Sequence, residues 1–123
     1  MKAALDDGKS IFLQIAEAIE DDILTGLTAE GELVPSTNQL ARHYAINPAT
    51  AAKGVNILAD EGIVYKKRGI GMCVVTGAKA KIMAKRKRDF YHDYVAALMR
   101  EAAKLGIQKT ELIEMIEKGD VNE

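Results

Sequence analysis

The sequence predicts a mainly α-helical fold with one small β-hairpin, followed by a helical tail, and three observations support this prediction. Apolar residues recur every three or four positions before Gly26 and again after Asp89, which is the spacing of one helix face. Two helix-start signals, Ser36 and Asn47, lie close together along the chain. Two short apolar runs then flank a glycine-containing turn at residues 68–71, which is typical of a hairpin.

The first predicted helix covers residues 10–25. Acidic side chains occupy one face, and apolar side chains occupy the other face, which is expected to be buried. Gly26 stands where helices commonly end in a left-handed residue. A polar turn follows, and residues 33–34 could add only a very short strand. The expected buried face consists of Phe12, Ile15, Ile19 and Ile23.

Two short helices are predicted next, and each begins at a capping residue. Ser36 and Gln39 have the spacing of a capping box, in which each side chain bonds the backbone N–H of the other residue. Asn47 is a second N-cap, with Pro48 at the first helical position, where a missing N–H costs nothing. The two helices are expected over about residues 37–43 and 48–60.

A β-hairpin is predicted after Gly62, with strands over residues 63–67 and 72–75. Its tip, residues 68–71, contains two glycines, which permit positive φ and close approach to a partner. Residues 66–68 are all Lys or Arg. Two capped helices followed by a basic hairpin are the outline of a winged helix-turn-helix. In that fold the second helix fits the major groove of DNA, and the wing fits the adjoining backbone or minor groove.

From about Ala78 the sequence predicts a long helix that ends before Gly106, and then a short helix over residues 109–118. A helical hairpin of about 45 residues has too little core to bury an apolar stripe by itself. The stripe therefore either packs on the rest of the chain or pairs with a second copy across a two-fold axis. We expect the second, with residues 1–77 binding DNA and residues 78–123 forming a dimerisation tail. The expected dimerisation residues are Phe90, Tyr91, Tyr94, Val95, Leu98, Ala102, Leu105, Leu112, Ile113 and Ile116.

The net charge of −1 conceals an uneven distribution of charge. Residues 1–78 carry 7 basic and 10 acidic side chains, residues 79–88 carry 6 basic and no acidic ones, and residues 89–123 carry 4 and 8. Locally positive surfaces on the hairpin and at the start of the tail are therefore compatible with DNA binding. The basic run at residues 79–88 either lines the DNA backbone or is simply solvated.

Other classes of protein are poorly supported. No apolar run approaches the roughly 20 residues that span a bilayer, and the N-terminus lacks the apolar core of a signal peptide, so we expect a cytoplasmic protein without a membrane partner. The single cysteine, Cys73, excludes an internal disulfide and is expected to be a small buried side chain. His43 has no paired carboxylate, and His92 between Asp89 and Asp93 makes only a poor metal site. We therefore predict no catalysis, no cofactor and no metal.

The order of these elements resembles the GntR family of bacterial transcription regulators over about residues 10–75. The family pattern has Gln-Ile-Ala in the first helix, a Pro-Ser-x-Arg-x-Leu-Ala helix start, a Leu-x-x-x-Gly-hydrophobic exit from the recognition helix and an Arg-x-Gly-x-Gly wing. The corresponding elements here are Gln14-Ile15-Ala16, the segment from Pro35 to Ala41, the segment from Leu58 to Ile63, and Arg68-Gly69-Ile70-Gly71.

The Asn47-Pro48-x-Thr50 helix start and the short helical tail are most similar to the YtrA subfamily. That resemblance implies a repressor of transporter genes that dimerises through a two-helix tail. Two positions depart from the family pattern. Asn38 replaces the family's arginine, so a bidentate phosphate contact is reduced to an amide hydrogen bond. Met72-Cys73 stands where Thr and Phe are common, which alters hairpin packing more than DNA contact.

The expected DNA contacts fall into three groups. The start of the first short helix offers donors to a phosphate, the recognition helix offers outward side chains to bases, and the wing offers positive charge. Ser36 and Asn47 also have a plainer interpretation as helix caps alone. The expected contacts are Ser36, Thr37, Asn38, Asn47, Pro48, Ala49, Thr50, Lys53, Lys66, Lys67, Arg68, Gly69 and Gly71.

The sequence thus predicts a homodimeric, sequence-specific repressor that binds double-stranded DNA at a palindromic operator. The alternative is a protein-interaction module that has lost operator recognition and uses its helical tail to bind a partner. Salt-dependent DNA affinity distinguishes the two. The tail leaves little room for the several-hundred-Å³ pocket that a small molecule usually needs. An effector, whose existence the sequence leaves open, would therefore bind at the dimer interface.

Overall fold

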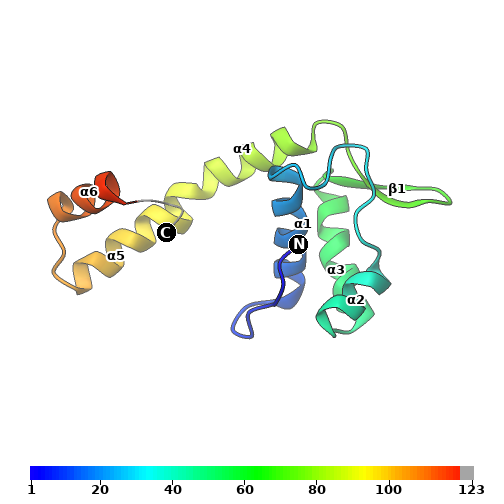
Figure 1. Ribbon diagram of the computed structural model, residues 1–123, viewed down its shortest axis with the longest axis horizontal. Helices are drawn as coiled ribbons and strands as arrows, with labels where there is room; N and C mark the ends of the chain where they lie inside the picture. The colour runs from blue at the N-terminus through cyan, green and yellow to red at the C-terminus, as the bar shows by residue number, and fades with distance from the viewer. Residues whose placement is uncertain (120–123) are drawn as a thin grey trace. The chain divides into compact units, whose positions relative to one another are not determined.

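The computed structural model describes residues 1–119, which are mostly helical with one two-stranded antiparallel sheet, as predicted (Figure 1). The chain forms two compact units that divide between Ala84 and Lys85, within α4, whereas the predicted division falls at the start of that helix. Residues 120–123 of the predicted tail lie outside the described residues. The elements are α1 (Ile11–Leu24), α2 (Thr37–Tyr44), α3 (Pro48–Asp60), β1 (Val64–Lys67), β2 (Gly71–Val74), α4 (Ala78–Phe90), the π-helix η1 (Tyr91–Val95), α5 (Ala96–Lys104) and α6 (Lys109–Lys118).

The core of the first unit lies between α1, α2, α3 and the hairpin. Ile15, Ile19 and Ile23 of α1 are buried in it, as predicted, but Phe12 is partly exposed because it lies at the edge, beside Lys53 of α3. Further buried side chains come from α2, α3, the residue before β1, both strands and the first turns of α4. These are Leu40, Ala51, Val55, Leu58, Ile63, Val64, Val74, Ala78 and Ile82.

The predicted capping interactions of α2 and α3 are both present. The Ser36 hydroxyl accepts the Gln39 backbone N–H at 3.1 Å, and the Gln39 carbonyl oxygen Oε1 accepts the Ser36 N–H at 2.8 Å. The Asn47 Oδ1 accepts the Ala49 N–H at 2.8 Å. Between the helices Ala45 has φ +54, a left-handed conformation that reverses the chain within a few residues. These local bonds fix where the recognition helix begins.

α1 and α3 approach each other closely at Gly54. A Cβ placed there would lie 2.7 Å from the carbonyl oxygen of Phe12 and 2.9 Å from Cβ of Ile15. Real Cβ atoms essentially never come so close, so only glycine allows this helix crossing. Gly54 therefore sets how near the recognition helix lies to α1.

The hairpin pairs Val64 with Val74 and Lys67 with Gly71 in an antiparallel register. An additional bridge joins Leu33 to Cys73, and the Val34 N–H donates to the Met72 carbonyl at 2.9 Å. The very short strand expected at residues 33–34 is therefore present as an isolated bridge. This third segment anchors the base of the hairpin to the rest of the first unit.

The second unit contains a feature that the sequence pattern did not predict. Where one continuous helix was expected, the five-residue π-helix η1 separates α4 from α5. Gly106, with φ +71, ends the helical run after α5, as predicted, and α6 has the predicted bounds. A π-turn takes more residues than an α-turn, so η1 changes which side chains share a face along the stripe.

Candidate nucleic-acid interface

The helix-turn-helix part of the first unit presents most of its predicted DNA contacts at the surface. α2 packs beside α3, and the short turn between them places the beginnings of both helices in one region (Figure 1). Thr37 and Thr50 are only partly exposed. The exposed members of the predicted set in this region are Ser36, Asn38, Asn47, Pro48, Ala49 and Lys53.

The capping roles of Ser36 and Asn47 leave each side chain with a free donor. Both caps use an oxygen as the acceptor. The Ser36 hydroxyl hydrogen and the Asn47 amide NH₂ therefore remain available to a phosphate or a base edge. The capping interpretation and the DNA-contact interpretation are compatible at both residues.

Lys53 is directed toward α1 by a cation–π contact. Its Nζ lies 4.0 Å from the centroid of the Phe12 ring. Such a contact at an exposed site contributes about 0.5–1 kcal/mol, which favours this rotamer but does not lock it. In the free protein, Lys53 therefore lies against α1, while Thr50 is partly buried.

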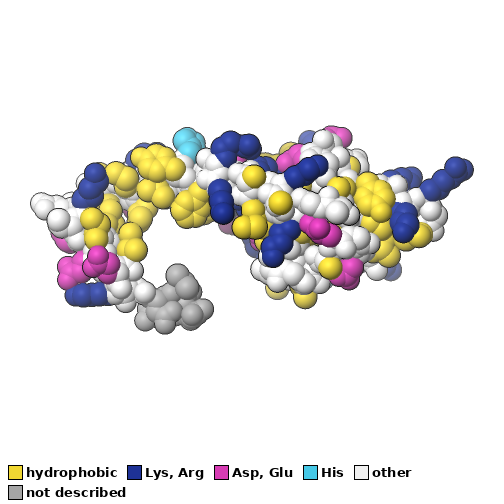
Figure 2. Space-filling model, turned by 90° about the horizontal axis from the view of Figure 1, so that it is seen from above, with side chains coloured by type: hydrophobic (Ala, Val, Ile, Leu, Met, Phe, Trp, Pro, Cys, Tyr) yellow, Lys and Arg dark blue, Asp and Glu magenta, His cyan; other side chains and the backbone are white. Residues whose placement is uncertain are grey.

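The tip of the wing is basic and exposed to solvent. Lys66, Lys67, Arg68 and Gly69 are all exposed, and Figure 2 shows Lys and Arg side chains at the far right, at the end of the hairpin. Gly69 has φ +78 and Gly71 has φ +137, conformations that L side chains rarely adopt. The glycines are therefore required by the shape of the turn itself, in addition to any approach to DNA.

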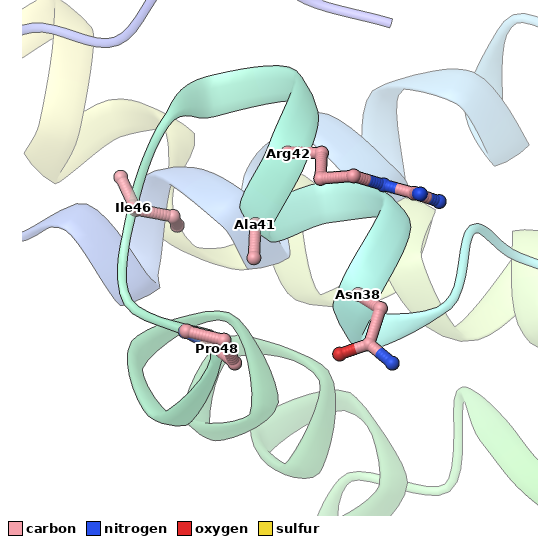
Figure 3. A pocket seen from close by; sticks show the side chains of 5 residues that line it. All are labelled: Asn38, Ala41, Arg42, Ile46 and Pro48. Carbon is pink, nitrogen blue, oxygen red and sulfur yellow. The ribbon is translucent and has the colours of Figure 1, made fainter.

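An open hollow of about 470 Å³ lies between α2 and the start of α3 (Figure 3). It is lined by Asn38, Ala41, Arg42, Ile46 and Pro48. Arg42 was not among the predicted contacts. The signal that could have identified it is its position four residues after Asn38, which places both side chains on one face of α2.

The predicted dimerisation residues are largely exposed in the second unit. Figure 2 shows apolar side chains gathered over the left part of the molecule, which carries η1, α5 and α6. Val95 and Leu112 are partly exposed, and Ala102 is buried. The exposed members of the predicted set are Phe90, Tyr91, Tyr94, Leu98, Leu105, Ile113 and Ile116, and the most exposed of these, Ile116, has an exposed fraction of 68%.

Cys73 and His92 carry side chains of the types that can react or bind a metal ion. Cys73 is a free, buried thiol, and the exposed His92 has its Nδ1 3.3 Å from the Asp93 carboxylate. Within residues 1–119, no cluster of three or more His, Cys, Asp or Glu side chains could hold a metal ion. No helix in that part of the chain is both long enough and apolar enough to cross a membrane.

The fold and the exposed recognition helix define a winged helix-turn-helix DNA-binding protein. The family model described as "Bacterial regulatory proteins, gntR family" matches residues 12–74, which is just over half of the chain. The chain belongs to the GntR family, as its motifs predicted. It is a transcription regulator with a DNA-binding domain in its N-terminal part.

Similar proteins include regulators of comparable length. The chain is 28% identical over 108 residues to the HTH-type transcriptional repressor YtrA of Bacillus subtilis, covering 88% of this chain and 82% of YtrA. A GntR family transcriptional regulator from Listeria monocytogenes matches with a TM-score of 0.74 and 28% identity, covering 94% of this chain and 100% of that one. BusR of S. agalactiae, in complex with its busA promoter DNA, matches with a TM-score of 0.57 and 30% identity, covering 84% of this chain and 50% of BusR.

Proposed function

We propose that this protein is a homodimeric repressor that binds a palindromic operator through α3 and the hairpin wing. The observation that carries the proposal is the exposed start of α3, residues 47–49, on the same compact unit as an exposed basic hairpin. A helix that enters the major groove by its N-terminal residues needs small or polar side chains there, and Asn47, Pro48 and Ala49 meet this need. The similarity to BusR, which was solved in complex with promoter DNA, supports binding to DNA.

The exposed apolar side chains of the second unit support dimerisation. Within the described residues, large apolar side chains recur at the surface from Phe90 to Ile116. Contiguous apolar surface of this kind usually marks an interaction site, because leaving it in water is unfavourable. A second copy covers it with the same surface and also supplies a second recognition helix. A two-fold dimer matches two half-sites, which makes the operator a palindrome.

Repression follows from occupying promoter DNA and excluding RNA polymerase. The named relative YtrA is a repressor, which supports this direction of regulation. Transporter genes are part of the proposal because the Asn47-Pro48-x-Thr50 start of the recognition helix resembles the YtrA subfamily. A reporter gene controlled by a selected operator should fall in expression when the protein is produced, and a rise in expression would refute repression.

The binding part of the proposal is tested with duplexes selected from a random library. Fluorescence anisotropy over a salt series compares the selected duplex with a scrambled duplex of the same composition. The proposal expects a steep salt dependence and a preference of at least about a thousandfold for the selected duplex. A steep salt dependence without any preference would leave only nonspecific binding. No binding at low salt would favour the interaction module instead.

A further inference from the structure

We propose that Arg42 binds a phosphate of the DNA backbone and supplies, from the last turn of α2, the guanidinium that position 38 lacks. This inference rests on the proposed DNA-binding function and adds to it a contact outside the predicted set. Arg42 and Asn38 line one side of the hollow between α2 and α3, and Pro48, the first residue of α3, lines the other side (Figure 3).

The chemistry of the hollow suits an anion. Its polar lining consists of an amide from Asn38 and a guanidinium from Arg42, and no carboxylate lines it. Both side chains are on exposed residues four apart on α2, so their Cβ atoms lie about 5–6 Å from each other. The remaining lining residues are Ala41, Ile46 and Pro48, which offer no side-chain acceptor to compete for the guanidinium.

The guanidinium is also free to bind a ligand. Within residues 1–119 the Arg42 side chain forms no hydrogen bond or ion pair with the protein. Several surface cations of this chain have such a partner; the Lys104 ammonium, for example, lies 3.7 Å from the Glu101 carboxylate. An arginine without a protein partner keeps all five N–H donors, whose fork matches two oxygens of a phosphate.

The position of Arg42 favours the DNA backbone over the bases. α3 is the helix expected to fill the major groove, and α2 lies beside its first turn. A long side chain on α2 is therefore placed over the strand that borders the groove, where phosphates are the nearest acceptors. Such a contact positions the protein and does not read sequence. At position 38 the shorter, uncharged amide lacks the fork of charged N–H donors with which a guanidinium binds a phosphate.

A competing explanation is that Arg42 only stabilises α2. It lies in the last turn of that helix, where a cation interacts favourably with the helix dipole. This role would change the melting temperature and leave the salt dependence of DNA binding unaltered. Lys104 offers a matched control, because it is also an exposed cation in the last turn of a helix, α5.

The test compares wild type, Arg42→Gln, Arg42→Lys and Lys104→Gln by anisotropy on the selected duplex and on the scrambled duplex over a salt series. Each lost phosphate contact lowers the slope of log affinity against log salt by about 0.9, so a dimer with two Arg42→Gln subunits loses about 1.8 units. At 1 M salt, screening removes this electrostatic contribution, so the variant and wild type should bind with equal affinity there. At 0.15 M salt, the change in slope makes the affinity of the variant about 30-fold weaker than that of wild type. Both duplexes should weaken equally, and Arg42→Lys should keep most of the slope.

The outcomes separate this inference from the function on which it rests. If wild type binds with a steep slope and Arg42→Gln has the same slope as Lys104→Gln, the Arg42 contact is refuted while DNA binding stands. If wild type itself does not bind, the proposed function fails first. Circular dichroism melting of each variant confirms that it is folded. A preferential loss of affinity for the selected duplex would overturn the backbone assignment in favour of base contact.

Discussion

A methyl group at Gly54 should disturb the crossing of α1 and α3 that positions the recognition helix. In Gly54→Ala the new Cβ would lie 2.7 Å from the Phe12 carbonyl oxygen and 2.9 Å from both Cβ and Cγ2 of Ile15. The first contact is to backbone, which cannot rotate away. Because favourable contacts between heavy atoms need about 3.5 Å or slightly less, the two helices must move apart by roughly half an ångström or more.

Two opposing effects determine how much Gly54→Ala changes the free energy of unfolding. Overpacking of a well-packed core usually costs about 1–3 kcal/mol, and the upper half of that range applies because one of the atoms is backbone. Alanine in place of glycine within a helix returns about 1 kcal/mol through its higher helix propensity. The net loss of unfolding free energy is therefore about 1–2 kcal/mol. For a unit of this size, that corresponds to a fall in Tm of roughly 4–16 °C.

Thermal melting followed by circular dichroism measures this change, with Gly8→Ala as the matched control. A Cβ at Gly8 has only the Asp6 Oδ1 near it, at 3.8 Å, which is ordinary contact. Gly8→Ala should therefore melt within a degree or two of wild type, a change of a few tenths of a kcal/mol. A Gly54→Ala protein that melts at or above the wild-type temperature would refute the close approach of the two helices.

Three further changes test other parts of the structure. Ser36→Ala should lower the unfolding free energy by about 1 kcal/mol, measured by urea denaturation, because it removes the N-cap of α2. Leu98→Glu should convert the proposed dimer to monomers in sedimentation velocity, because it places a charge in the apolar stripe. The Glu30 carboxylate accepts backbone N–H bonds from Gly77 and Lys79, which lowers its pKa below the ordinary 4.5. Its stabilising contribution is therefore present above that value and disappears as pH falls through the lowered pKa, so the Tm difference between wild type and Glu30→Gln should shrink between pH 7 and pH 3.

Each of these three predictions has a control and a result that would contradict it. Ser10→Ala should cost less than Ser36→Ala, since Ser10 caps α1 without a side-chain hydrogen bond; equal losses would count against the capping role. Leu27→Glu changes an exposed leucine outside the second unit and should remain dimeric, and a dimeric Leu98→Glu would disprove the interface. A Tm difference that does not vary with pH would show that Glu30 ionisation does not stabilise the fold.

Features governed by neighbouring residues could be predicted from the sequence. The Ser36–Gln39 capping box and the Asn47 cap each depend on residues at most three positions apart, so the pattern alone located the starts of α2 and α3. The hairpin was predicted for the same reason, because two glycines at its tip adopt the positive φ that the turn requires. Together these local signals were enough for the fold class and the family.

Features that depend on distant parts of the chain could not be predicted in this way. The Gly54 crossing and the contact of Lys53 with Phe12 both require knowing that α1 lies against α3. The spacing of Arg42 from Asn38 places both side chains on one face of α2, but the hollow that they line is formed only once Pro48 of α3 lies across it. The π-helix η1 interrupts a pattern that reads as continuous helix, and no single residue in it marks the change in backbone hydrogen bonding.

The proposed function requires that two copies of this chain bind one palindromic operator. Sedimentation velocity of a labelled selected duplex, intact or with one half-site scrambled, measures both stoichiometry and affinity. We expect two chains on the intact duplex and a large loss of affinity, on the order of a hundredfold or more, when one half-site is scrambled. One chain on the intact duplex, or equal affinity for both duplexes, would contradict it.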